Sequence, residues 1–190
     1  MPFFKSMPAD AGPANVFRTY PDIFGHWVKM SQAVMNGPSP FSPGEREMIA
    51  TYVVGLAECK YAYAAHAAAT YAWGIEEGGI EEGLVEALLA DPETAAIEPK
   101  FKPLLAFVKK LTLTPSKMAK ADAEAVFATG WDERALHDAI LITARMSFMN
   151  RLVEGYGFTP MDPERAKADA RLRVAKGYRD KYPEFAEKKG

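Results

Sequence analysis

Three side chains able to do chemistry lie close together in a long apolar stretch of this chain. Glu47, Cys59 and His66 supply a carboxylate, the only thiol among 190 residues, and an imidazole. If a helix begins at or just after Cys59, then Cys59, Ala62 and His66 are separated by three and four positions and share one helical face. The thiol would also lie at a helix N-terminus, where free backbone N–H groups and the helix dipole favour a thiolate.

Two interpretations of these residues remain open. In the first, Glu47 orients or charges His66, and His66 exchanges protons with Cys59 or with a substrate. In the second, Cys59 is a small buried hydrophobic residue, His66 is a core histidine, and Glu47 stabilises the N-terminus of its own helix. The uncharged surroundings of Glu47 favour the first, because a carboxylate there is either exposed at an edge or buried and paired.

The sequence around these residues predicts a hairpin of two buried helices. Ser42-Pro43-Gly44-Glu45 is a capping box with proline at the first helical position, and it predicts a helix that continues to about residue 57. The next helix, over residues 60–73, has many alanines and no charged side chain after its first residue. Helices that are apolar on most sides are buried on most sides, so this pair would form a central antiparallel hairpin.

The rest of the chain predicts an all-α fold. Apolar residues recur at helical spacing in segments 21–35, 81–89, 100–113, 119–127 and 133–153, and a charged helix begins after Asp162. Residues 74–79 are predicted to form a turn. We expect an extended N-terminal arm at 1–20, a helical domain at 21–160, and a charged C-terminal helix and fraying tail at 161–190.

Composition narrows the possible functions. The chain is 48% hydrophobic and 25% charged with a formal net charge of −2, which favours a globular domain and neither a nucleic-acid nor a membrane partner. The sequence has no signal-peptide pattern, and one cysteine excludes an internal disulfide framework, so we expect a cytoplasmic protein. His26 and His137 lie far from His66 in sequence, and no metal or organic cofactor is expected.

One further polar pair, Asn150-Arg151, lies in an apolar context near the end of a predicted helix. These two side chains could line a pocket. Capping of the helix end is the alternative.

The spacing of the reactive residues resembles the signature of the AhpD-like superfamily, which contains alkylhydroperoxidase D and carboxymuconolactone decarboxylase. Eleven residues separate Glu47 from Cys59, and His66 follows seven positions later. Segments 20–22, 37–39, 42–47 and 148–152 resemble the peroxidase-related branch, and the similarity covers about residues 18–158. The resemblance implies an AhpD-like helical bundle, assembly as a homo-oligomer and catalytic roles for Glu47, Cys59 and His66.

One position departs from the pattern of the redox members. They carry Cys-x-x-Cys, in which the second cysteine attacks the peroxide and the first resolves the product as a disulfide. This chain has Ala62 at the second position. That disulfide cycle cannot run within one site, which makes Glu47 and His66 safer candidates than Cys59.

Three functions follow from the resemblance. The first is a peroxidase-related oxidoreductase in which Cys59 forms a sulfenic acid that an external thiol reduces. The second is a cofactor-free decarboxylase or lyase that uses Glu47 and His66 as acid and base on a small carboxylated or lactone substrate, with Tyr61 or Arg151 helping to bind an anion. The third is a non-catalytic helical oligomer.

Overall fold

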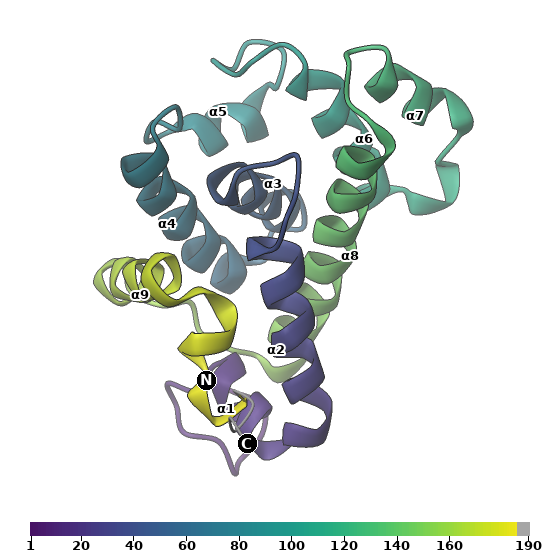
Figure 1. The fold of residues 1–190 in the computed structure, drawn as a ribbon. Coiled ribbons are helices and arrows are strands. Elements are labelled where there is room, and N and C mark those ends of the chain that lie inside the picture. Colours follow the sequence, from purple (N-terminus) through teal and green to yellow (C-terminus); the bar gives the residue numbers. More distant parts are fainter. Residues whose placement is uncertain (186–190) are drawn as a thin grey trace, which may run out of the picture.

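The computed structural model describes residues 1–185 and contains helices but no strand within them (Figure 1). The α-helices are α1 (Pro13–Thr19), α2 (Pro21–Asn36), α3 (Pro43–Leu56), α4 (Lys60–Glu77), α5 (Leu84–Ala90), α6 (Phe101–Leu113), α7 (Lys120–Phe127), α8 (Glu133–Tyr156) and α9 (Pro163–Lys181), with short 3-10 turns at Pro115–Lys117 and Pro183–Phe185. The predicted all-α fold is confirmed. Within residues 1–185, no helix has the length and apolar character needed to cross a membrane.

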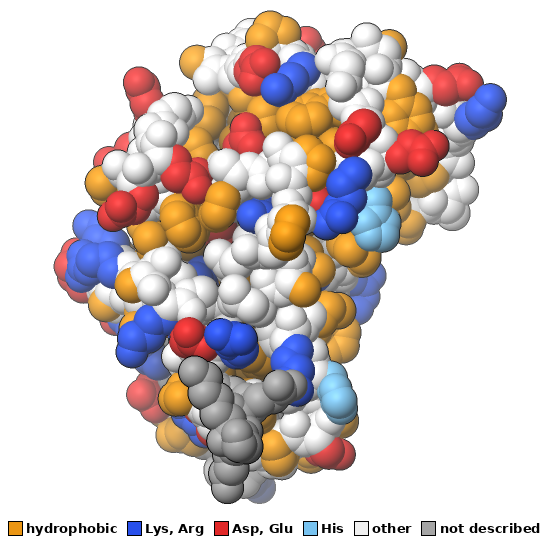
Figure 2. All heavy atoms as spheres, viewed as in Figure 1, with side chains coloured by type: hydrophobic (Ala, Val, Ile, Leu, Met, Phe, Trp, Pro, Cys, Tyr) orange, Lys and Arg blue, Asp and Glu red, His pale blue; other side chains and the backbone are white. Residues whose placement is uncertain are grey.

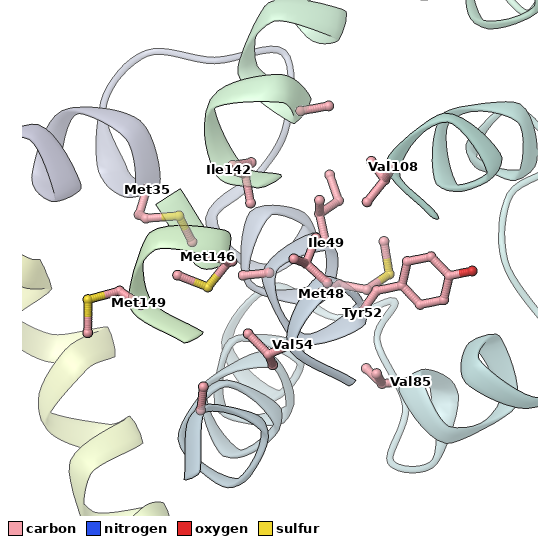
Figure 3. Packing of buried hydrophobic residues seen from close by; sticks show 14 of the residues in the cluster. Met35, Met48, Ile49, Tyr52, Val54, Val85, Val108, Ile142, Met146 and Met149 are labelled. Atoms are coloured by element: carbon pink, nitrogen blue, oxygen red, sulfur yellow. The ribbon is translucent and has the colours of Figure 1, made fainter. Parts of the chain in front are cut away.

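Helix α3 lies at the centre of the molecule. The predicted capping box is present: the Ser42 hydroxyl accepts from the Glu45 amide (3.2 Å), and the Glu45 carboxylate accepts from the Ser42 amide (2.8 Å). Nearly every residue from Gly44 to Val54 is buried. Helices α4, α5, α6 and α8 pack around α3. Figure 3 shows apolar side chains of α5, α6 and α8 gathered around those of α3. The predicted central hairpin is therefore formed by α3 and α4.

Helix α4 is longer than predicted. It continues through Gly74 to Glu77, whereas the sequence predicted a turn from Gly74. The glycine here serves close packing: a Cβ at Gly74 would lie 2.2 Å from the Ile80 carbonyl oxygen. The turn begins instead at Gly78, whose positive φ of 78° ends the helix.

The predicted extended arm at residues 1–20 is wrong for residues 13–19, which form α1. Pro13 occupies the first helical position, and the Asn15 side chain accepts from the Gly12 amide (3.0 Å). Tertiary packing explains the helix, because Val16 and Phe17 are buried and the Phe17 ring stacks on another aromatic ring from α2.

The predicted charged C-terminal helix is present as α9, which begins after Asp162 and packs against α4 and α2. Figure 1 shows it crossing beside α4. A break at Gly177 (φ 64°, ψ −165°) redirects its last turn, and the Gln32 side chain accepts from the Tyr178 amide (2.7 Å). The end of the expected fraying tail, residues 186–190, lies outside the described residues.

Candidate functional site

A cavity of about 380 Å³ is lined by residues of α1, α2, α4, α8 and α9. Among the described residues that line it, one carboxylate, Asp169, faces a larger set of cationic side chains: Arg18, Arg145, Arg165, Arg173 and Lys181. Figure 2 shows Lys and Arg side chains gathered over α9 on this face of the molecule. This excess of positive charge favours a small anionic ligand.

His66 and Glu47 form a buried pair at the wall of this cavity. Glu47 lies in the first turns of α3 and is 2% exposed, and its Oε2 is 2.6 Å from His66 Nδ1. The Tyr178 hydroxyl donates to the other carboxylate oxygen, Oε1, at 2.8 Å. The structure thus brings together two of the three residues that sequence spacing selected, and their catalytic roles stay predictions.

The protonation of this pair follows from its surroundings. Burial alone would raise the pKa of Glu47, but the neighbouring Arg173 and His66 bring it well below its usual value. Burial, together with Arg173, lowers the pKa of His66 to about 4, against the opposing effect of Glu47. At neutral pH the pair is therefore a carboxylate and a neutral imidazole.

The tautomer of His66 follows from its two neighbours at Nδ1. Arg173 Nη1 lies 3.1 Å from Nδ1, but a guanidinium can only donate, whereas the Glu47 carboxylate can only accept. The shorter contact of 2.6 Å therefore places the imidazole proton on Nδ1, where it is donated to Glu47. The lone pair is then on Nε2, for which no hydrogen bond is found within residues 1–185.

Sequence reasoning missed Arg173 and Tyr178, which α9 brings to the pair. Arg173 Nη1 donates to the Tyr178 hydroxyl (3.0 Å) and lies 3.4 Å from Glu47 Oε2, and Nη2 donates to Asp169 (3.3 Å). A sequence pattern that could have revealed them was present in the charged helix α9. A buried stripe recurs there at helical spacing and consists of Ala166, Ala170, Arg173 and Gly177. An arginine within such a stripe indicates a buried ion pair.

Cys59 does not share the cavity of His66. It caps α4 in a non-helical conformation (φ −79°, ψ 91°), is 1% exposed, and lines a separate hollow that includes Tyr63 and Leu89. Burial raises the pKa of the thiol to about 11, with a contribution in the same direction from the adjacent Glu154, against the opposing backbone N–H groups of Ala62 and Tyr61. The expectation that Cys59 is a thiolate is therefore wrong, because burial outweighs the backbone N–H groups at the helix N-terminus. Ala62, in contrast, lines the main cavity beside His66.

The predicted substrate-binding residues lie in different places. Tyr61 lines the main cavity. Asn150 and Arg151 line another hollow, and Arg151 donates to the Ser147 carbonyl of its own helix (2.8 Å). The structure does not bring Asn150 and Arg151 to His66. Within residues 1–185, no cluster of three or more His, Cys, Asp or Glu side chains could hold a metal ion.

Two solved structures are similar to this one. An uncharacterized peroxidase-related protein from Ralstonia eutropha JMP134, an alkylhydroperoxidase AhpD core, is 26% identical with a TM-score of 0.70, over 83% of this chain and 80% of that one. An uncharacterized peroxidase-related protein from Silicibacter sp. TM1040 is 22% identical with a TM-score of 0.64, over 84% of this chain and 95% of that one, and this likeness shows the fold alone. No family model and no curated protein matches the sequence.

Proposed function

Because this chain is an AhpD-like protein that resembles the peroxidase-related branch, we propose that its cavity performs acid–base chemistry on a small molecule, with His66 as the base. One observation carries the proposal: a neutral imidazole at the cavity wall has its Nδ1 held by a buried carboxylate 2.6 Å away. A carboxylate in that position fixes the ring and stabilises the imidazolium formed when Nε2 accepts a proton.

The surrounding side chains have supporting roles in this chemistry. Tyr178 and Arg173 both contact Glu47 and keep it ionised. In the reaction, Nε2 takes a proton from a carbon next to a carbonyl group, the substrate keeps the electron pair, and the imidazolium returns the proton. Arg173, which lines the cavity, stabilises the negative charge that develops on the substrate.

The low pKa of His66 keeps its imidazole neutral and able to accept a proton, but it also makes the imidazole a weak base. Burial and the nearby guanidinium groups of Arg173 and Arg145 disfavour its charged form. An anionic substrate would offset these guanidinium charges and stabilise the imidazolium. We therefore expect substrate binding to raise the pKa of His66 towards the range in which proton exchange is efficient at neutral pH.

The proposal is tested with a panel of small lactones, β-keto acids and unsaturated carboxylates incubated in D₂O and followed by NMR. Wild type and Cys59→Ser should convert or deuterate the same compound, whereas His66→Asn should not. Asn can still donate a hydrogen bond to Glu47 from the position of Nδ1 but offers no base. A reaction abolished by Cys59→Ser and retained by His66→Asn would contradict the proposal.

Thiol peroxidase chemistry is a second candidate, favoured by one observation. Ala62, where the redox members of the superfamily carry their second cysteine, lines the cavity beside His66. The remaining thiol, Cys59, is buried elsewhere. If the site retains a redox scaffold that lacks one thiol, Ala62→Cys should gain peroxide consumption that wild type lacks. Peroxide consumption by wild type that is lost in Cys59→Ser would instead establish Cys59 as the peroxidatic residue.

A further inference from the structure

We infer that Arg145 is the binding residue for a carboxylate group of the ligand that occupies this cavity. The inference deepens the proposed function and rests on it for the identity of the ligand as a substrate. It assigns the anion to Arg145 of α8, which lines the cavity together with His66, and not to Arg151 of the same helix, which the sequence analysis named as a possible anion-binding residue.

Arg145 is a buried cation for which no ion pair is found within the described residues. It is 5% exposed, and within residues 1–185 no carboxylate lies within ion-pair distance of it. Its Nε donates to the Ser31 hydroxyl (3.1 Å), and its Nη1 contacts the Met146 sulfur (3.7 Å). The guanidinium also lies over the rings of Trp27 and Tyr178, at 5.3 and 4.5 Å from their centroids, but neither ring neutralises its charge. Burying a guanidinium without a carboxylate beside it is costly, so an anion that binds there would stabilise it.

Two other buried arginines of this fold have the strong acceptors that Arg145 lacks. Arg46 is 3% exposed and donates to three backbone carbonyl groups. Arg173 is 6% exposed and lies against two carboxylates, Glu47 and Asp169. Arg145 has neither kind of partner, although it is as deeply buried as they are.

An unsatisfied donor belongs to another arginine that lines the same cavity. Arg173 Nε is buried and has no hydrogen-bond partner within the described residues. The guanidinium groups of Arg145 and Arg173 both lie over the Tyr178 ring, at 4.5 and 5.1 Å from its centroid. Two cationic groups that line one cavity therefore lie against one ring, and an anion bound in that cavity would be attracted by both.

The residues that line the cavity indicate a carboxylate. The planar fork of a guanidinium matches the two oxygens of a carboxylate. The apolar side chains of Val28, Met149 and Val153 line the same space and can contact a small carbon skeleton. The one lining carboxylate, Asp169, is already occupied by Arg173 and Lys181, so the protein itself cannot supply the anion.

Calorimetric titration with benzoate and with inorganic phosphate tests the inference. Wild type should bind benzoate more tightly than phosphate, and Arg145→Met should bind benzoate weaker by about tenfold or more. Arg151→Met is the matched control, an exposed arginine on the same helix that pairs with its own helix carbonyl, and it should bind as wild type does. Arg145→Lys keeps the positive charge but not the planar fork of the guanidinium. Its benzoate affinity should lie between those of wild type and Arg145→Met.

Three results would overturn the inference: unchanged benzoate affinity in Arg145→Met, stronger binding of phosphate than of benzoate, or no benzoate binding by wild type. Without ligand, Arg145→Met should melt at or above the wild-type temperature, because the substitution removes an unneutralised buried charge. A lower melting temperature with unchanged benzoate affinity would instead show a purely structural arginine. Benzoate binding needs no turnover. Normal benzoate binding by a protein that catalyses no reaction would therefore contradict the acid–base proposal but not the inference about Arg145.

Discussion

Lowering the pH from about 7 to 5 should destabilise this protein because of one buried imidazole, His66. Burial and Arg173 lower its pKa to about 4 in the folded protein, from 6.5 in an ordinary environment. Between these two values the unfolded chain binds a proton that the folded protein excludes. Stability is therefore fully present above pH 6.5 and is lost as the pH falls towards 4.

The size of this loss follows from the two pKa values. Each pKa unit is worth about 1.4 kcal/mol, so a difference of about 2.5 corresponds to roughly 3 kcal/mol across the whole window, and to roughly 2 kcal/mol by pH 5. The Glu47 carboxylate affects stability only at lower pH. Its pKa is depressed from 4.5 in the folded state, so its contribution to stability is present above 4.5 and is lost only as the pH falls below that value.

Urea denaturation at pH 7.5 and at pH 5 measures this loss as a change in the free energy of unfolding. Wild type and the control His137→Asn, which alters an exposed histidine, should both lose roughly 2 kcal/mol. His66→Asn should lose little, because it has no group at this site that titrates between pH 5 and 7.5. An equal loss in His66→Asn and wild type, or no loss in wild type, would refute the assignment of a neutral buried His66.

Two further substitutions and one alkylation reaction test other contacts of this structure. Arg173→Met should lower the free energy of unfolding by about 3–5 kcal/mol, because it leaves Glu47 as a buried charge without its cation; a loss below about 1 kcal/mol in urea denaturation would contradict this pairing. Gly177→Ala should cost about 1–3 kcal/mol because only glycine readily adopts φ 64° with ψ −165°, whereas Gly155→Ala, with open space around its Cβ position, should be neutral or stabilising. Iodoacetamide should alkylate Cys59 at pH 7.5 on the order of a hundredfold more slowly in the folded than in the urea-denatured protein, since burial raises the thiol pKa from 9.0 to about 11; similar rates would show an accessible, reactive thiol.

Local sequence signals predicted the scaffold of the site. The capping box at Ser42 and the Asp162 cap mark the starts of α3 and α9, since both motifs depend on residues within one helical turn. The pairing of Glu47 with His66 was also within reach, because both lie on one helical hairpin and a carboxylate on an uncharged helical face needs a partner.

The remaining parts of the site depend on contacts between distant segments. Arg173 lies 107 residues from His66 along the chain, and no local pattern reveals that α9 closes over α4. The pKa of Cys59 is set by burial and by Glu154 from α8, which outweigh the helix N-terminus that sequence spacing emphasised. Arg145 was missed for a related reason: the sequence of a long helix does not show that one of its arginines is buried without a carboxylate within ion-pair distance.

The protonation state of His66 is the central claim, and the nitrogen chemical shifts of its imidazole test it most directly. Two-bond ¹⁵N–¹H NMR spectra, assigned with His66→Asn, report both the tautomer and the titration of the ring. We predict a neutral ring protonated on Nδ1 at pH 7, with a pKa of about 4 that rises when benzoate is added. A ring that is already an imidazolium at pH 7, or that carries its proton on Nε2, would contradict the assignment of His66 as the base.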